Sequence, residues 1–143
     1  MGVEWIRKSL GVLMSLQAVQ NQIIQLDFLK AYEHLKSLNY DFCFENTARD
    51  FKKVNSVTMY AFMMFVISQE EDATKHITIC NYLYFMNPYI SGADQIIRWH
   101  ILRALEMFPQ SASMIRCWVM SIYDGNPDCP FTDVELQKIK SKV

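Results

Sequence analysis

The sequence predicts an all-α protein, a single domain over residues 1–143 in which about seven or eight antiparallel helices form a repeat-like array of helical hairpins. Three observations predict this fold. Apolar residues recur at spacings of three and four along most of the chain. Helix-capping residues and prolines separate the periodic segments. No pair of candidate strands is joined by hairpin turn residues.

Composition supports one folded domain and narrows the partner classes. Apolar residues make up 51% of the 143 residues and charged residues 20%, a balance that supports a full core and argues against disorder. The formal net charge is −1, so no basic excess draws the chain to nucleic acid or to an anionic membrane. We therefore expect a protein partner, with no direct binding of nucleic acid.

Location and redox state follow from the N-terminus, the hydropathy and the cysteines. The first residues lack a signal-peptide pattern, and the longest apolar run, residues 57–67, is about half a membrane span. The four cysteines are widely spaced, without a zinc-binding pattern. The sequence thus predicts a cytoplasmic protein with reduced thiols, no bound metal and no membrane association.

The first half of the chain leaves two boundaries open. Helical periodicity extends over residues 3–38, but Gln and Asn interrupt it within 17–25, so one long helix or two helices fit. Residues 39–55 are less regular and fit either a short helix or a loop. Asn55 then caps a helix over 57–69, whose apolar residues on nearly all faces predict a central, buried helix.

Residues 70–108 have the pattern of one helical hairpin. Residues 70–72 are acidic and precede the first helix, where unpaired amides and the helix dipole favour negative charge. Pro88 ends that helix because proline cannot continue it. Ser91 and Asp94 have the spacing of a capping box and begin the second helix.

Two further helices complete the prediction. Residues 115–122 carry one apolar face, and the segment 124–128, which contains Gly and Pro, ends that helix. Thr132 and Glu135 form a capping box for the last helix, which extends to about Lys142 and finishes with lysines that suit a helix C-terminus.

The residues that could support catalysis do not form a recognisable site. His34, His76 and His100 fall on three different predicted helices, and we interpret the last two as buried residues that hydrogen-bond a neighbouring helix. Cys80 and Cys117 lie within apolar helical runs, where a free cysteine is expected to be buried. Neither is at a helix start, where a thiolate would be stabilised. The sequence therefore predicts a protein that is not an enzyme and needs no cofactor.

Acids and loop aromatics are the candidate partner-binding residues. Exposed aromatic residues are expected in or near loops at Tyr89, Tyr123 and Phe131. The acids are caps and solvated turns first, but in an antiparallel array the starts of alternate helices meet at one end, where acids form a rim. The candidate partner-binding residues are Glu70, Glu71, Asp72, Tyr89, Asp94, Tyr123, Asp124 and Asp128.

Residues 70–143 carry an ordered series of features. The series consists of Glu71-Asp72-Ala73 with His76, Ser91-Gly92-Ala93, His100 with Ala104-Leu105, Pro109, Trp118 to Tyr123, Pro127 and the Thr132–Glu135 cap. It resembles the small all-helical bacterial immunity proteins that partner polymorphic and contact-dependent growth inhibition toxins. Lys75 departs from that pattern, which has an aromatic residue before the histidine.

The resemblance implies a function and leaves competitors. It implies an immunity protein, or antitoxin, that binds the C-terminal domain of its cognate toxin, often a nuclease such as a ribonuclease, and covers its active site. An acidic rim would then face a basic substrate cleft. Two alternatives remain open: a helical adaptor that binds a peptide or a partner helix, and a virus-encoded Bcl-2-like protein, suggested by the apolar helix 57–67. The oligomeric state is left open.

Overall fold

The computed structural model describes residues 2–87 and 89–141, and these contain helices and no strand. The all-α prediction is confirmed, with eight α-helices, one π-helical turn and one 3₁₀ turn in the described residues. Two expected helix ends, at Pro88 and at Lys142, lie outside these residues. The elements are α1 (Gly2–Ile24), α2 (Phe28–Ser37), α3 (Phe44–Asp50), α4 (Ser56–Gln69), α5 (Ala73–Asn81), η1 (Tyr82–Met86), α6 (Ala93–Met107), η2 (Pro109–Ser111), α7 (Ala112–Tyr123) and α8 (Asp133–Ser141).

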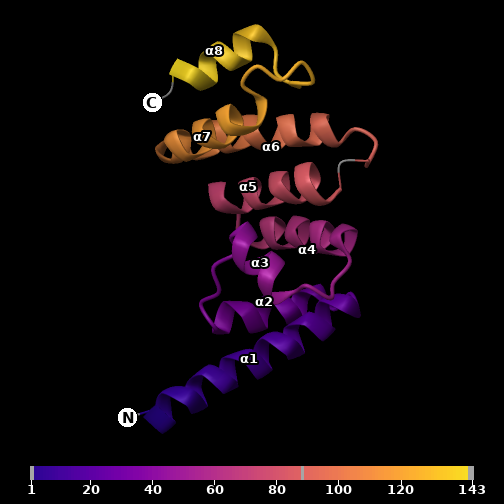
Figure 1. Ribbon diagram of the computed structural model, residues 1–143, viewed down its shortest axis with the longest axis vertical. Helices are drawn as coiled ribbons and strands as arrows, with labels where there is room; N and C mark the ends of the chain where they lie inside the picture. The colour runs from indigo at the N-terminus through magenta and orange to yellow at the C-terminus, as the bar shows by residue number, and fades with distance from the viewer. Residues whose placement is uncertain (1, 88, 142–143) are drawn as a thin grey trace.

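The helices stack in layers along the long axis of the molecule (Figure 1). Helix α1 forms one end and α8 the other, so the N- and C-termini lie at opposite ends. Each layer contacts mainly the next, through α1 with α2, α4 with α5, α5 with α6, and α7 with α8. A single cluster of buried apolar residues runs through these layers from Val19 to Ile139. Such a stack buries its core between layers and leaves the edges of the helices on the surface.

The two open boundaries are resolved by the backbone. Two helices are present rather than one, because α2 begins at Phe28. Helix α1 continues through the glutamines at 17–22, since glutamine is a good helix former, and ends at Ile24, inside the segment 17–25. The chain turns directly afterwards, where Leu26 has a φ of 63°. In the segment 39–55, the short helix α3 is present and loops flank it.

Three of the four predicted caps are present. The Asn55 side chain accepts a hydrogen bond from the Val57 amide at 2.8 Å. Asp72 accepts one from the Lys75 amide at 2.9 Å. In the Thr132–Glu135 box, the Thr132 amide donates to the Glu135 carboxylate at 2.9 Å, and the Glu135 amide donates to the Thr132 hydroxyl at 3.2 Å.

The predicted capping box at Ser91 is wrong. The N-cap of α6 is Gly92, which has a φ of 79° and makes no side-chain cap. Glycine adopts this left-handed backbone without strain, so the chain enters α6 through a turn that places Ser91 one residue too early to cap it.

The two cap patterns make a paired prediction. Replacing Thr132 by Ala is expected to lower the free energy of unfolding by about 1 kcal/mol, the usual cost of losing a threonine cap. Ser91→Ala is the matched control and is expected to change it by less than about 0.5 kcal/mol, because the Ser91 hydroxyl caps nothing. Urea unfolding of both variants measures the difference, and equal losses would contradict this assignment of the caps.

Helix α4 is central in the stack but is not buried on all sides. Met59, Phe62, Met63 and Val66 are buried, whereas Val57 is 53% exposed. Helix α4 contacts α1 and α2 in one direction and α5 in the other, so the faces between these layers reach the surface. The prediction of a helix enclosed on every side was therefore wrong.

Candidate protein-binding surfaces and a buried histidine network

Helices α5 and α6 are joined by a continuous chain of polar side chains. The Arg103 guanidinium donates two hydrogen bonds to the Glu71 carboxylate, at 2.8 and 2.9 Å. Glu71 lies 2.6 Å from Nε2 of His76, and Nδ1 of His76 lies 2.7 Å from Nδ1 of His100. Both imidazoles are buried. The interpretation of these two histidines as interhelical hydrogen-bonding residues is confirmed.

The charges of the network fix where its protons lie. The Arg103 hydrogen bonds lower the pKa of Glu71 to about 2, with a further contribution from His76, against the opposing effect of burial. Glu71 is therefore a carboxylate and accepts a hydrogen bond, so Nε2 of His76 carries a proton. Burial lowers the pKa of His76, and in the neutral ring Nδ1 must accept. The proton between the two rings therefore belongs to Nδ1 of His100.

This network suits a structural role better than proton transfer. Burial, and then the neighbouring His76, lower the pKa of His100 to about 3. A base with so low a pKa takes up little of a substrate's proton near neutral pH. The network instead ties the first residues before α5 to the C-terminal half of α6 with charge-assisted hydrogen bonds, which are stronger than neutral ones.

The cysteines divide between interior and surface. All four are free thiols, as predicted. Cys80 is buried as expected, and burial raises the pKa of its thiol, which disfavours the nucleophilic thiolate. Cys117 is exposed on α7, so its expected burial was wrong. Among the described residues, no group of three His, Cys, Asp or Glu side chains could hold a metal ion.

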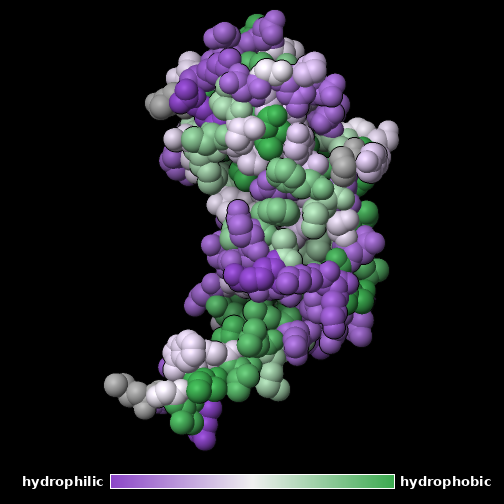
Figure 2. Space-filling view, in the orientation of Figure 1, coloured by the Kyte–Doolittle hydropathy of each residue, from purple (hydrophilic) through white to green (hydrophobic). Residues whose placement is uncertain are grey.

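The N-terminal half of α1 carries an exposed apolar surface and projects from the stack as an arm (Figures 1 and 2). We call residues 2–14 the α1 arm. Trp5 is 71% exposed, and hydrophobic side chains gather over this end of the molecule in Figure 2. The exposed large apolar residues of the arm are Val3, Trp5, Ile6, Leu10, Val12, Leu13 and Met14.

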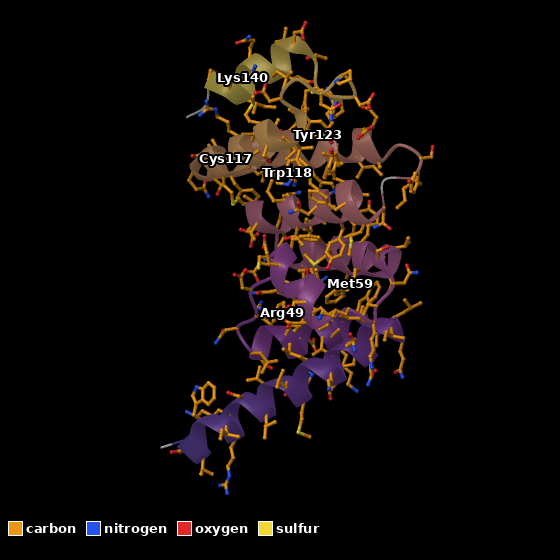
Figure 3. The ribbon with its side chains drawn as sticks, viewed as in Figure 1. Arg49, Met59, Cys117, Trp118, Tyr123 and Lys140 are labelled. Atoms are coloured by element: carbon orange, nitrogen blue, oxygen red, sulfur yellow. The ribbon has the colours of Figure 1, made fainter. Side chains whose placement is uncertain are left out.

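A groove runs along α1 next to the arm, on the side that faces the end of α3. It has a volume of about 590 Å³ and lies between α1 and the end of α3. Leu13 and Leu16 line it from α1, while Arg49, Lys52 and Lys53 line it from the other side. Figure 3 marks Arg49 on α3. The arm thus combines an exposed apolar face with a mixed polar groove at its base.

The acidic groups do not form one rim. Residues 70–72 precede α5 and meet the C-terminal half of α6, through the contact of Glu71 with Arg103. Asp94 is in the first turn of α6, at the opposite end of that helix. Helices α5 and α6 are consecutive and antiparallel, so their starts lie at opposite ends, and the prediction of a single acidic rim was wrong.

The acids before α5 make contacts within the protein. Glu70 accepts a hydrogen bond from the Tyr32 hydroxyl at 3.3 Å and lies 3.7 Å from the Lys36 ammonium. Asp72 caps α5 and pairs with Lys75 at 2.7 Å. Lys75, which departs from the immunity-protein pattern, is buried with its ammonium over the Phe42 ring. We conclude that the first role of these acids is to stabilise the start of α5 within the fold.

Of the three aromatic candidates, one is exposed and two are buried. Tyr89 is 97% exposed, as expected of a loop aromatic. Tyr123 and Phe131 are buried, so their predicted exposure was wrong. Their rings pack edge to face at 5.8 Å, and Tyr123 also contacts Tyr84 and Trp118 in this way. The last turn of α7 and the segment after it fold inward around this aromatic cluster.

A hollow of about 340 Å³ brings together three predicted residues, namely Asp94, Tyr123 and Asp128. Asp94 comes from the start of α6, and the other two come from the end of α7 and the turn that follows. Asp124 is exposed in the same turn but does not line the hollow. Figure 3 marks Tyr123 at this end of α7.

The sequence did not identify the ion-paired arginines or the α1 arm as candidate functional features. Arg103 pairs with Glu71 and Arg98 with Glu135, and each pair joins residues more than 30 positions apart. No local pattern marks such contacts. The arm did carry a signal, because apolar residues occupy most of the circumference of residues 3–16, which is more than one buried face requires.

Comparison with models of protein families, with curated protein sequences and with solved structures gives no match to the chain. In the part of the chain that the structure describes, no helix is both long and apolar enough to cross a bilayer.

Proposed function

We propose that the protein is an immunity protein, which binds the toxic domain of a cognate toxin and neutralises it by covering its active site. The observation that carries this proposal is the α1 arm, an apolar helical face that the other described residues leave exposed. Large exposed apolar patches on folded proteins mark sites of interaction. A neutraliser of this kind needs a rigid and specific surface rather than chemistry of its own.

The composition of the arm suits a protein interface. It offers Trp5 together with aliphatic side chains and one methionine, and tryptophan is among the residues that most often dominate binding energy. The arm is about 20 Å long at the rise of an α-helix, and the groove at its base widens the contact. A partner that contacted both the arm and the groove could bury close to the roughly 800 Å² per side of a standard interface.

A membrane surface fits the arm less well. Helices that lie on anionic bilayers carry many lysines and arginines on the polar face. The arm has Arg7 and Lys8 balanced in part by Glu4. This small positive excess supplies little attraction to anionic lipid, so a protein partner is the better account.

The interior of the stack supports a rigid binding scaffold. Its buried polar groups are largely paired, for example Asn87 with Ser56 and the Tyr82 hydroxyl with Thr47. Satisfied buried networks favour one well-defined packing. A nuclease is the toxin class we propose. The acids at the start of α6 and directly after α7, namely Asp94, Asp124 and Asp128, would face the basic cleft that such an enzyme needs for its substrate.

The proposal predicts that a toxin domain is encoded upstream of this chain, and co-expression with that domain tests it. We expect the full chain to restore growth of cells that produce the toxin domain and to co-purify with it at a fixed stoichiometry. A catalytically inactive form of the toxin domain provides the control for expression. Co-purification without restored growth would favour a helical adaptor. The absence of both restored growth and co-purification would overturn the proposal.

A further inference from the structure

The hollow between the start of α6 and the end of α7 is lined on three sides. Leu83 and Tyr84 come from η1, while Ala93, Asp94 and Ile97 come from α6. The remaining wall is formed by Tyr123, Asn126 and Asp128. Among the residues that the structure describes, no lysine, arginine or histidine lines it. The hollow therefore combines two carboxylates with an apolar floor and an aromatic side wall.

The two carboxylates have no cation of their own. Among residues 2–87 and 89–141, neither Asp94 nor Asp128 forms an ion pair, although five other ion pairs are present. Asp128 is held in place by its backbone, because its amide donates to the Asn126 side chain at 2.9 Å. Asp94 is held by the first turn of α6. Two negative charges thus line one small volume.

Tyr123 adds an independent indication that something binds here. Its side chain is almost wholly buried, and its hydroxyl has no hydrogen-bond partner within the described residues. A buried hydroxyl left unpaired destabilises the fold. Burial, and then the charge of Asp94, raise the pKa of Tyr123, so the hydroxyl keeps its proton and its oxygen can still accept. That oxygen has almost no accessible surface, so a donor in the hollow reaches it through a small side-chain shift, of the kind that is common at interfaces.

We propose that this hollow binds the guanidinium group of an arginine from the protein partner. A guanidinium carries five N–H donors in a planar fork, which can serve two carboxylates and a hydroxyl at once. Its plane can also stack on an aromatic ring, and Tyr84 supplies one at the wall. A lysine ammonium is a compact point charge that would reach fewer of these groups.

This inference deepens the proposed function and names a contact within it. In Figure 1 the α1 arm projects from one end of the stack, whereas the start of α6 lies in the other half of the molecule and on the opposite side. The arm and the hollow are therefore two separate contacts with the proposed partner.

The test uses a small probe on the full chain. Nα-acetyl-arginine methylamide is titrated and followed by ¹⁵N chemical-shift changes, with the matching citrulline compound as the uncharged control. We expect saturable shifts at residues 93–97 and 123–128 with a dissociation constant of about 1 mM, and no saturation with citrulline. Asp94→Asn and Asp128→Asn should each weaken binding about fivefold. Asp124→Asn, which removes the same charge outside the hollow, should leave binding unchanged.

Tyr123→Phe supplies the second part of the test. It is expected to weaken probe binding about threefold without lowering the melting temperature, because only an unpaired hydroxyl is removed. A lower melting temperature would show that the hydroxyl has a partner inside the fold and would overturn the inference. Equal shifts with arginine and citrulline, or equal effects of Asp124→Asn and Asp94→Asn, would overturn it as well.

The outcome is separable from that of the proposed function. If the probe fails to bind but the chain still neutralises the toxin domain, this inference alone is wrong. If the probe binds as expected and co-expression gives neither rescue nor co-purification, the proposed function alone is wrong.

Discussion

Replacing Trp5, Ile6, Leu10 and Leu13 together by glutamine is expected to abolish binding of the toxin domain while leaving the fold intact. These side chains are 51–71% exposed and form the apolar face of the arm. Interface residues of this kind cost about 2 kcal/mol each when they dominate binding, so four losses predict a fall in affinity of at least about a thousandfold. Calorimetric titration of the purified variant measures it.

The choice of glutamine and a scattered control make the result specific. Glutamine is a good helix former, so circular dichroism should show an unchanged helical content and melting should shift by no more than a few degrees. The matched control replaces four exposed apolar residues elsewhere, Leu29, Val57, Met107 and Val134, by glutamine. The control is expected to bind like the parent chain. Equal loss of affinity in both variants would remove the arm from the interface.

Acidification from pH 7 to pH 5 is expected to lower the free energy of unfolding by about 2 kcal/mol through His100 alone. The pKa of this buried histidine falls to about 3 in the folded protein, against about 6.5 in an unfolded chain. Between these two values the unfolded state holds a proton that the folded state lacks. Stability is therefore fully present above pH 6.5 and is lost as the pH falls below it. Urea unfolding at the two pH values measures the change.

Other members of the network act in the same direction. The pKa of buried His76 is also lowered, so it adds to the loss below pH 6.5. The stabilising effect of the ionised Glu71 is lost only at lower pH, between about 4.5 and 2. Acid should therefore weaken the contact between α5 and α6 in two successive stages.

Variants of two histidines separate this effect from general acid sensitivity. His100→Leu removes the group and should reduce the loss between pH 7 and pH 5 by about 2 kcal/mol. His34→Gln is the control, because His34 lies half-exposed on α2 and outside the network. The control should keep the full acid sensitivity of the parent chain. If His100→Leu kept it too, the network would not be its source.

Much of the fold could be predicted from the sequence because local chemistry determines it. Helical spacing marks α4 to α8, and the caps at Asn55, Asp72 and Thr132 each depend on residues within three positions. The failures were also local. Gly92 replaced Ser91 as the N-cap because a left-handed glycine redirects the chain, and periodicity does not report that.

The candidate sites depend on contacts that periodicity does not contain. The pairing of Glu71 with Arg103 and the meeting of Asp94 with Tyr123 require the antiparallel packing of specific layers. Tyr123 was assigned to the surface because it precedes a turn, yet the turn folds back over it. The arm shows the opposite case. Its excess of apolar residues was visible in the sequence, but only the structure shows that none of the described helices covers them.

Hydrogen–deuterium exchange of the chain, alone and with the toxin domain, tests the central claim most directly. The arm is a helix with few tertiary contacts, so its amides should exchange quickly in the free chain. Binding through the arm predicts a strong slowing of exchange over residues 3–14 in the complex. Slowing confined to other helices, with unchanged exchange over residues 3–14, would contradict the assignment of the α1 arm as the binding surface.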